Sequence, residues 1–390
     1  MSPGSFLLGT VKKKIDNNNN NYRNVNYNYY RHPARISLLL FLLTLTASMI
    51  VFSSFSSSLS SPSIFPSANA FHLAKHYVFV KKWGSLCMLK SLEGCNMNAP
   101  GAKEVGDGQF QRPHDLDFDP QEKYLYTLDR DGNRVQVFDK NGTFIMKWGS
   151  KGAGDGQFFN PYGVDVDSAG NVWVVERNGE RVQKFDKDGN FLFKFGSLGA
   201  GEGQFNFPRM IAVDKDLKYV YVVDSNNNRI QKFDINGNFV MSWGSNGTGD
   251  GQFMVPVSVV IDNNGDIIVD ERGNARVQKF DSNGKFLLKF GSEGPGDGQF
   301  SHIEHIAIDK YNNIYVNDPQ SDATGNHIPR VQKFSPDGKF ITKIGSGYGT
   351  GDGQFIDPEH LAIDSNGYVY VSDRGNNDIQ VFKPVDDIHP

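Results

Sequence analysis

Three places in the chain put a histidine directly beside a carboxylic acid: His114-Asp115, Glu304-His305 and Glu359-His360. Neutral imidazoles and carboxylates are ligands that Zn²⁺ and similar divalent ions accept. We therefore interpret His114, His305 and His360 as candidate metal ligands, with zinc as the candidate cofactor. The alternative is an ordinary polar surface of solvated side chains, and the residue types alone leave both open.

Signals for other kinds of catalysis are missing from the sequence. It contains no Gly-x-Ser-x-Gly nucleophile motif, no His-Glu-x-x-His zinc motif and no phosphate-binding loop. His302-Ile303-Glu304 resembles one half of the zinc-deaminase signature, but the Cys-x-x-Cys half is absent. The two cysteines are too few for a zinc finger or an iron–sulfur cluster.

The charge balance argues against a nucleic-acid-binding protein. The chain has 40 Lys and Arg residues and 44 Asp and Glu residues, a formal net charge of −4. Residues 1–35 hold six of the basic residues and one of the acids, so the rest of the chain is more acidic still. A nucleic-acid binder needs a basic surface that neutralises phosphates. We therefore expect no nucleic-acid partner.

The elements that position the histidines are set by an internal repeat. The string Gly-[Asp/Glu]-Gly-Gln-Phe occurs six times, with its Gln at positions 109, 157, 204, 252, 299 and 354. The intervals are 48, 47, 48, 47 and 55 residues, so the fifth repeat carries an insertion of about eight residues. A constant period of this length predicts a repeat architecture.

Each repeat contains four short strand signals separated by Gly-rich turns. In the second repeat these are residues 161–167, 171–176, 181–186 and 191–197, where aromatic and β-branched residues are frequent. No segment after residue 75 offers helical spacing over ten residues. Four strands in about 47 residues are typical of one blade of a β-propeller.

The sixth repeat lacks a fourth strand of its own. Residues 77–85, before the first repeat, match residues 144–150, the fourth strand of the first repeat, in kind. We expect this N-terminal strand to complete the last blade and close the ring, which removes exposed sheet edges. The predicted fold is thus an all-β, six-bladed β-propeller of four-stranded blades over residues 77–385, followed by a short tail, 386–390.

The repeated residues resemble the NHL-repeat family. The resemblance rests on Pro161-Tyr-Gly-Val-Asp-Val-Asp167 and on Asp224-Ser-Asn-Asn-Asn-Arg229-Ile-Gln-Lys-Phe233, patterns that recur over residues 77–383. It implies a six-bladed propeller used mostly as a binding platform and sometimes as an enzyme scaffold. Peptidyl-amidoglycolate lyase-like members bind zinc through a His after Pro. Only Pro113-His114 matches that position, whereas His305 and His360 lie one position later.

Acid–arginine pairs recur at one spacing, and we interpret them as scaffold rather than as a site. Four of them share that spacing: Asp129/Arg134, Glu176/Arg181, Asp224/Arg229 and Glu271/Arg276. Charge-assisted hydrogen bonds that fix a loop explain such repetition. The sixth repeat has Asp378 where the Arg belongs, so we expect no such ion pair there.

Function is expected where the repeats differ, at the two positions after the Pro that opens the innermost strand. Ring closure makes the fifth, sixth and first blades neighbours, which gathers the three histidine–carboxylate pairs on one arc of the channel mouth. Tyr162 and Arg209 lie across the mouth and would orient an anionic or aromatic ligand group. The predicted ligand-binding residues are His114, Asp115, Tyr162, Arg209, Glu304, His305, Glu359 and His360.

The first residues read as a targeting region. Residues 1–35 form a basic, Asn/Tyr-rich lead, expected to be disordered, and residues 36–55 form a membrane span or signal-peptide core with Ile36–Phe52 uncharged. A Ser-rich linker, 56–76, follows and contains a cleavage pattern ending at Ala70. Two forms remain open: a single-pass anchor with its N-terminus inside, or secretion after cleavage. Both place the propeller outside the cytoplasm.

Two further modifications follow from that compartment. Cys87 and Cys95 share one loop and are expected to form a disulfide, with two free thiols as the alternative. Asn141 and Asn246 begin glycosylation sequons, although each also fits a plain Asn-Gly turn.

We interpret the chain as an exported binding platform that presents one face of the propeller to a protein, peptide or glycan. The alternative is a metal-dependent lyase, or a lactonase-type hydrolase, with its site at the channel mouth. The missing catalytic motifs favour the binding platform.

Overall fold

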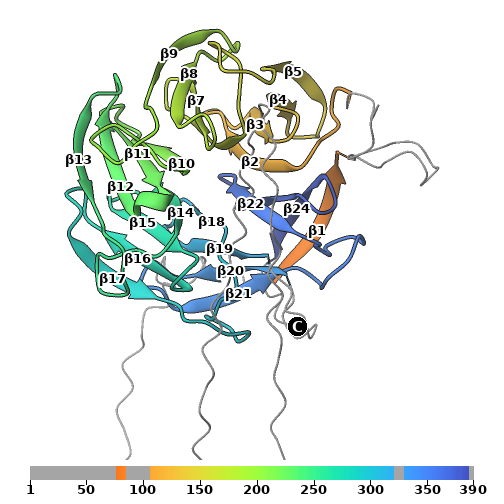
Figure 1. Cartoon of the computed structure of the whole chain (residues 1–390). Coiled ribbons are helices and arrows are strands. Elements are labelled where there is room, and N and C mark those ends of the chain that lie inside the picture. The colour runs from red at the N-terminus through yellow and green to blue at the C-terminus, as the bar shows by residue number, and fades with distance from the viewer. Residues whose placement is uncertain (1–75, 85–105, 320–328, 386–390) are drawn as a thin grey trace, which may run out of the picture. The chain divides into compact units, whose positions relative to one another are not determined.

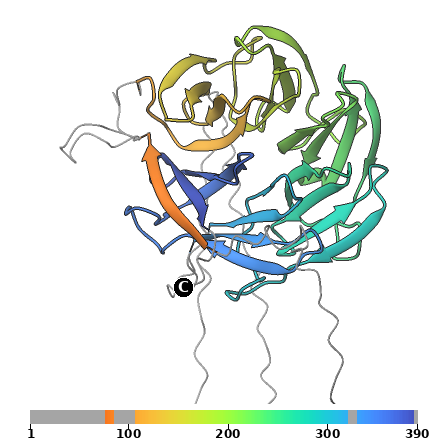
Figure 2. The same ribbon diagram turned by 180° about the vertical axis from the view of Figure 1, so that it is seen from behind.

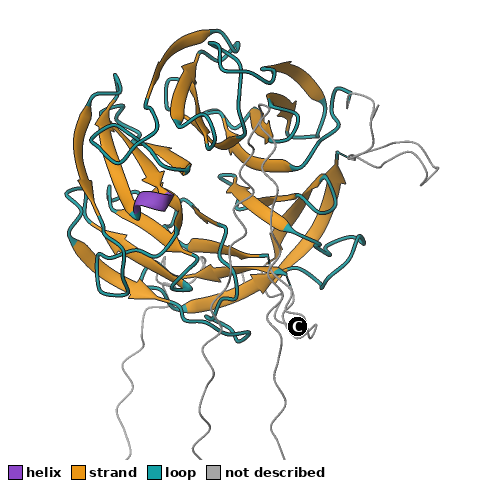
Figure 3. Ribbon diagram, viewed as in Figure 1, coloured by secondary structure: helices purple, strands orange, loops and turns teal. Residues whose placement is uncertain are grey.

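The computed structural model describes residues 76–84, 106–319 and 329–385. These residues form six four-stranded antiparallel sheets arranged as a ring of blades (Figure 1). Figure 2 shows the same ring from behind. Within the described residues the only helical element is one short turn, η2 (Ser225–Asn227) (Figure 3). The predicted fold class is confirmed.

Each blade runs from an innermost strand at the channel to an outer strand at the rim (Figure 1). The first three blades contain β2 (Pro113–Phe118), β3 (Tyr124–Asp129), β4 (Arg134–Asp139) and β5 (Phe144–Trp148); β6 (Pro161–Val166), β7 (Val172–Glu176), β8 (Arg181–Phe185) and β9 (Phe191–Phe195); and β10 (Pro208–Val213), β11 (Tyr219–Asp224), β12 (Arg229–Asp234) and β13 (Phe239–Trp243).

The remaining three blades follow the same order. They contain β14 (Pro256–Ile261), β15 (Ile267–Glu271), β16 (Arg276–Phe280) and β17 (Phe286–Phe290); β18 (His305–Ile308), β19 (Ile314–Asp318), β20 (Arg330–Phe334) and β21 (Phe340–Ile344); and β22 (Pro358–Ile363), β23 (Val369–Asp373) and β24 (Asp378–Val385) with β1 (His76–Trp83).

The three inner strands of each blade are buried almost throughout, whereas the outer strand alternates in five of the six blades. In β9 the residues are partly buried and exposed in turn, as the Phe-x-Phe-x-Phe pattern predicts. The phenylalanine of each Gly-Gln-Phe string is fully buried; these residues are Phe110, Phe158, Phe205, Phe253, Phe300 and Phe355. Their aromatic rings pack between blades and account for the recurrence of the string.

The ring closes as the sequence predicts. β1 pairs antiparallel with β24, from His76 opposite Val385 to Trp83 opposite Ile379. Lys82 of β1 donates through Nζ to the carbonyl oxygen of Thr350, at 2.9 Å. The N-terminal strand therefore supplies both the missing strand and a side-chain link to the last blade.

The repeated arginines are structural, and they join more than a single loop. Arg181 pairs with Glu176 (Nε–Oε1 2.5 Å) and also donates to the carbonyls of Ala153, Gly154 and Gln157. Each arginine thus ties the strand-2 acid to the Gly-rich turn that enters its blade. This explains why the pair accompanies the string in the first five blades.

The sixth blade lacks this ion pair, as expected. Asp378 takes the place of the arginine, and Lys82 lies 3.9 Å from it (Nζ–Oδ2). The carbonyl of Thr350, which Lys82 reaches, corresponds to that of Ala153, which Arg181 reaches in the second blade. A lysine from the N-terminal strand therefore contacts the turn that the missing arginine would hold.

Several predicted features lie outside the described residues: the basic lead, the segment Ile36–Phe52, the cleavage pattern at Ala70, and Cys87 with Cys95. No helix in the described part of the chain is long and apolar enough to cross a membrane. Asn141 and Asn246 are both exposed, at turns on the surface, and their glycosylation stays a prediction.

Candidate functional site

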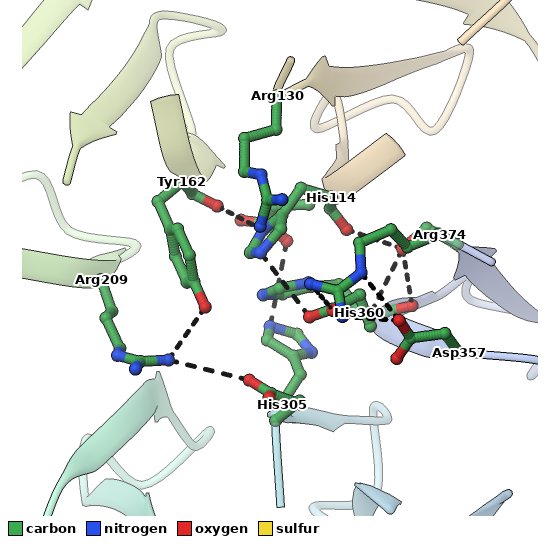
Figure 4. Close-up of polar contacts among 12 residues, drawn as sticks. His114, Arg130, Tyr162, Arg209, His305, Asp357, His360 and Arg374 are labelled. Carbon is green, nitrogen blue, oxygen red and sulfur yellow. Dashed lines mark hydrogen bonds and ion pairs between the residues drawn. The ribbon is translucent and has the colours of Figure 1, made fainter. Parts of the chain in front are cut away.

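The innermost strands bring the predicted residues to one end of the channel. All eight are buried: His114, Asp115, Tyr162, Arg209, Glu304, His305, Glu359 and His360. Figure 4 shows the three histidines side by side, with Tyr162 and Arg209 across the mouth from them. The arrangement follows from the ring, because β2, β18 and β22 are adjacent only when the chain closes.

His360 is the centre of a histidine cluster. Its ring centroid lies 4.2 Å from that of His114 and 4.6 Å from that of His305. Each outer histidine is held by the backbone of the next blade: His114 Nδ1 lies 2.9 Å from the carbonyl oxygen of Tyr162, and His305 Nδ1 lies 3.4 Å from the amide of Leu361. These contacts fix the ring orientations.

Two carboxylates extend the cluster into two overlapping sets of potential metal ligands. One set is His114, Glu359 and His360, and the other is Asp115, His305 and His360; within each set the ligand atoms lie within 4.8 Å of one another. His360 belongs to both. The three predicted histidines therefore lie together. They form two overlapping sets, each of two histidines and one carboxylate, rather than one set of three histidines.

The two sets differ in how many of their ligand atoms are free. Both oxygens of Asp115 already accept backbone hydrogen bonds, from Leu116 at 2.8 Å and Val164 at 2.6 Å. By contrast, neither ring nitrogen of His360 has a hydrogen-bond partner among the described residues, and the same holds for His114 Nε2. Buried polar atoms without partners cost about 1–3 kcal/mol each, so a group that paired with these nitrogens would remove that cost.

Burial keeps the three histidines neutral. It lowers the pKa of His305 from 6.5 to about 3, and it also lowers the pKa of His114 and of His360 well below 6.5. Burial and, after it, the nearby charge of Glu304 raise the pKa of Glu359 to about 8. Neutral imidazoles can bind a metal through their lone pairs, whereas a protonated carboxyl must first release its proton.

His114 has the tautomer that metal binding requires. Its Nδ1 faces a carbonyl, which only accepts hydrogen bonds, so Nδ1 carries the proton and Nε2 carries the lone pair. Nε2 lies 3.6 Å from Glu359 Oε2. A histidine oriented by a second contact and a carboxylate beside it match the donor types of catalytic zinc sites.

Glu304 is not part of the histidine cluster. It contacts Arg272, lies 2.8 Å from His302 (Oε1–Nε2), and lies 3.8 Å from Arg209 (Oε2–Nη1). Arg209 in turn donates to the hydroxyl of Tyr162 at 2.9 Å. Glu304, Arg209 and Tyr162 therefore form a second polar group, which meets the histidine cluster where Tyr162 contacts His114.

The sequence analysis missed a set of arginines at the mouth. In four blades the residue directly after the strand-2 acid is arginine: Arg130, Arg177, Arg272 and Arg374. Arg374 binds Glu359 and Asp357, and Figure 4 shows Arg130 beside His114. A signal for them exists in the sequence: the residue after the strand-2 acid varies among the repeats, whereas the acid itself is present in all six.

The channel continues below the histidines as a cavity of about 290 Å³. Asp115 and His305 line it, together with Asp117, Asp165 and apolar residues of the innermost strands. His114 and Glu359 do not line it. The ligand set of His114, Glu359 and His360 therefore belongs to the arginine side of the site rather than to the channel interior.

The fold and the site define a six-bladed β-propeller with a histidine cluster at its channel mouth. A family model described as a 6-bladed beta-propeller matches residues 168–243 and 247–323, and a model of the NHL repeat matches residues 355–382. The chain therefore contains an NHL repeat within a six-bladed β-propeller.

Solved structures of other proteins share this fold. They include a protein of unknown function from Bacteroides thetaiotaomicron (17% identity, 72% of this chain and 72% of that chain, TM-score 0.53). Hydrazine synthase of Kuenenia stuttgartiensis (16%, 74% and 80%, 0.52) and a gluconolactonase from Xanthomonas campestris (13%, 71% and 87%, 0.52) are also similar. At these identities the likeness concerns the fold alone.

Proposed function

We propose that this propeller binds its ligand through a divalent metal ion, zinc by preference, held at the channel mouth by His114, Glu359 and His360. The observation that carries the proposal is the set of buried ring nitrogens without partners, His114 Nε2 and both nitrogens of His360. Two imidazoles and one carboxylate leave a fourth tetrahedral position for the ligand. His305 lies behind His360 and keeps its ring in place.

The shape of the site favours a small ligand or the end of a chain. The metal ligands are almost completely buried, so a flat protein surface would not reach them. A peptide terminus, a glycan end or a small molecule would. In this proposal the propeller is an extracytoplasmic binding module, exported through its N-terminal segment, and the ligand enters from the arginine side.

A metal-dependent enzyme is the second candidate. Opposite the metal ligands, Tyr162 contacts the ring of His114 (centroids 3.9 Å apart), and its hydroxyl accepts a hydrogen bond from Arg209. A phenol and a guanidinium beside a Lewis acid are groups that a lyase or a lactonase-type hydrolase can use. Steady-state assays with peptidyl-α-hydroxyglycine and simple lactones test this candidate directly.

Elemental analysis of the purified full-length protein after zinc loading and dialysis tests the metal site. We expect one zinc ion per chain in the wild type and a loss of stoichiometric zinc in His360→Ala. His76→Ala is the matched control, because His76 is exposed at the start of β1, and it should retain the metal. A wild type without stoichiometric zinc, or a His360→Ala variant that keeps it, contradicts the proposal.

A further inference from the structure

Five guanidinium groups gather around the channel mouth, in a chain whose net charge is negative. Four come from the position after the strand-2 acid, and the fifth, Arg209, comes from β10. They lie near one another. Burial lowers the pKa of Arg177, and the positive charges of Arg209, Arg272 and Arg130 lower it as well. We call Arg130, Arg177, Arg209, Arg272 and Arg374 the arginine ring.

Acids contact four members of the arginine ring: Arg130 pairs with Asp131 (Nε–Oδ1 3.2 Å) and Arg374 with Asp357. Glu304 is shared between Arg209 and Arg272. Arg374 contacts Glu359, a carboxylate that the metal site also uses.

Arg177 is the clearest case of an arginine without an acid. Its guanidinium lies against two aromatic rings, 5.1 Å from the centroid of Tyr162 and 5.0 Å from that of Phe207, and makes no ion pair with a described acid. Its Nε is buried without a hydrogen-bond partner, as are those of Arg209 and Arg272. Arg177 as a whole is partly buried, and a ligand that supplies the missing acceptor would offset the cost of the unpaired Nε.

The scaffold does not require arginine at this position. The corresponding residues of the third and fifth blades are Ser225 and Pro319, and both blades form with the same strands. The Gly-Gln-Phe string, whose phenylalanine fills the core, recurs in all six blades, whereas arginine follows the strand-2 acid in only four. The arginines therefore point to the ligand rather than to stability.

We infer that the arginine ring binds an oxyanion of the ligand, a carboxylate or a phosphate group, on the side of Arg177 and Arg209. This inference rests on the proposed function, because it names the class of ligand that reaches the metal: an acidic one. Arginine forks match the two oxygens of such a group. The ring of Tyr162 contacts both guanidinium groups: its centroid lies 5.1 Å from Cζ of Arg177 and 5.3 Å from Cζ of Arg209.

Anion binding by the metal-free protein tests the arginine ring separately from the metal site. The full-length protein is stripped with a chelator, dialysed, and titrated by calorimetry with glutarate, inorganic phosphate and the neutral analogue glutaramide at low ionic strength. We expect saturable binding of glutarate or phosphate, no binding of glutaramide, and weaker affinity as salt rises. The tighter of the two anions identifies the group.

Two variants locate the binding. Arg177→Gln should weaken it by about tenfold or more, since two or more charge-assisted hydrogen bonds are lost. Arg112→Gln, at an exposed arginine just before β2, is the matched control and should change affinity by less than about twofold. If Arg177→Gln does not fold, Arg177→Lys keeps the charge, loses the fork, and should also bind more weakly.

The outcomes separate the two proposals. His360→Ala should lose zinc and keep anion affinity, whereas Arg177→Gln should keep zinc and lose anion affinity. The inference is overturned if the wild type binds neither anion, if the Arg177 variants bind as the wild type does, or if Arg112→Gln weakens binding equally. If the protein binds zinc but neither anion, the proposal of anion binding by the arginine ring is wrong and the proposal of the metal site is supported.

Discussion

At the scale of single residues, one backbone contact decides the chemistry of the mouth. The carbonyl of Tyr162 holds the proton of His114 on Nδ1 and so directs the Nε2 lone pair at Glu359 and His360. His305 has its own Nδ1 near an amide rather than a carbonyl. Three histidines that look equivalent in the sequence therefore differ in which nitrogen is free.

Asp378 gives a pH-dependent prediction. Burial, followed by repulsion from Asp373, raises the pKa of Asp378 to about 7. Because this lies above the ordinary value of 3.8, the folded state favours the protonated form; the stability it provides is full below about pH 4 and is lost as the pH rises through about 7. Asp378→Asn should therefore raise the free energy of unfolding by about 1–3 kcal/mol at pH 8.

Urea unfolding at pH 4, 6 and 8 measures this difference. The variant and the wild type should be similar at pH 4 and diverge as the pH rises. Asp352→Asn is the control, since Asp352 also lies near Lys82 but is 68% exposed, and its stability should change by less than about 0.5 kcal/mol. An Asp378→Asn variant that is less stable than the wild type at pH 8 would show that Lys82 needs this carboxylate.

Much of the mouth could be predicted from the sequence, because the variable positions fall at one place in a repeated frame. The repeat, together with ring closure, predicts that His114 and His360 lie side by side. It could not show that Glu304 turns to Arg209 and Arg272, since side-chain direction depends on the cations around it. The sequence also could not show which ligand atoms are free. The ring nitrogens of His360 have no hydrogen-bond partner among the described residues, whereas Asp115 accepts a hydrogen bond from the backbone of Val164 in the next blade.

At the scale of elements, the turn that joins two blades is a packing device. Its phenylalanine fills the space between sheets, and the glycine that ends the preceding outer strand allows the ring to approach. Gly196 has φ +101°, and a Cβ built there would lie 2.5 Å from the ring of Phe205. Phe205 is fully buried and pairs through a bridge with Leu198. The chain needs glycine here for both its backbone and its space.

Gly196→Ala should lower the free energy of unfolding by about 2–4 kcal/mol, because it adds a steric clash to a strained φ. Gly170→Ala is the matched control: its φ is +85°, but nothing lies within 4 Å of its Cβ position. It should cost only about 1 kcal/mol. Chemical denaturation of the two variants separates the effect of the steric clash from that of the strained φ. Equal losses in the free energy of unfolding would mean that the clash with Phe205 contributes nothing.

At the scale of the whole molecule, the ring depends on a strand that comes from the far end of the sequence. The match between residues 77–85 and the outer strands was enough to predict closure, and β1 confirms it. What the sequence did not reveal is Lys82, whose role depends on the arginine that the last blade lacks.

A protein that begins at Gly101 should lose β1 and expose the edge of β24. We expect it to aggregate or to melt at a lower temperature, because an open edge can pair with other chains. A protein that begins at Phe71 keeps β1 and is the control. Light scattering after size-exclusion chromatography, with thermal unfolding, measures both; a monomeric Gly101 form with an unchanged melting temperature would refute closure by β1.

The pairing of β1 with β24 also sets how the molecule responds to force. β1 has a neighbour on one side only, and its first residue, His76, lies opposite Val385. Tension that arrives along the chain before His76 reaches this outer strand before any other part of the ring. The eight residues of β1 therefore bear such a load before the blades do. A pull strong enough to detach those residues would remove the outer strand of the sixth blade and leave β24 as its exposed edge.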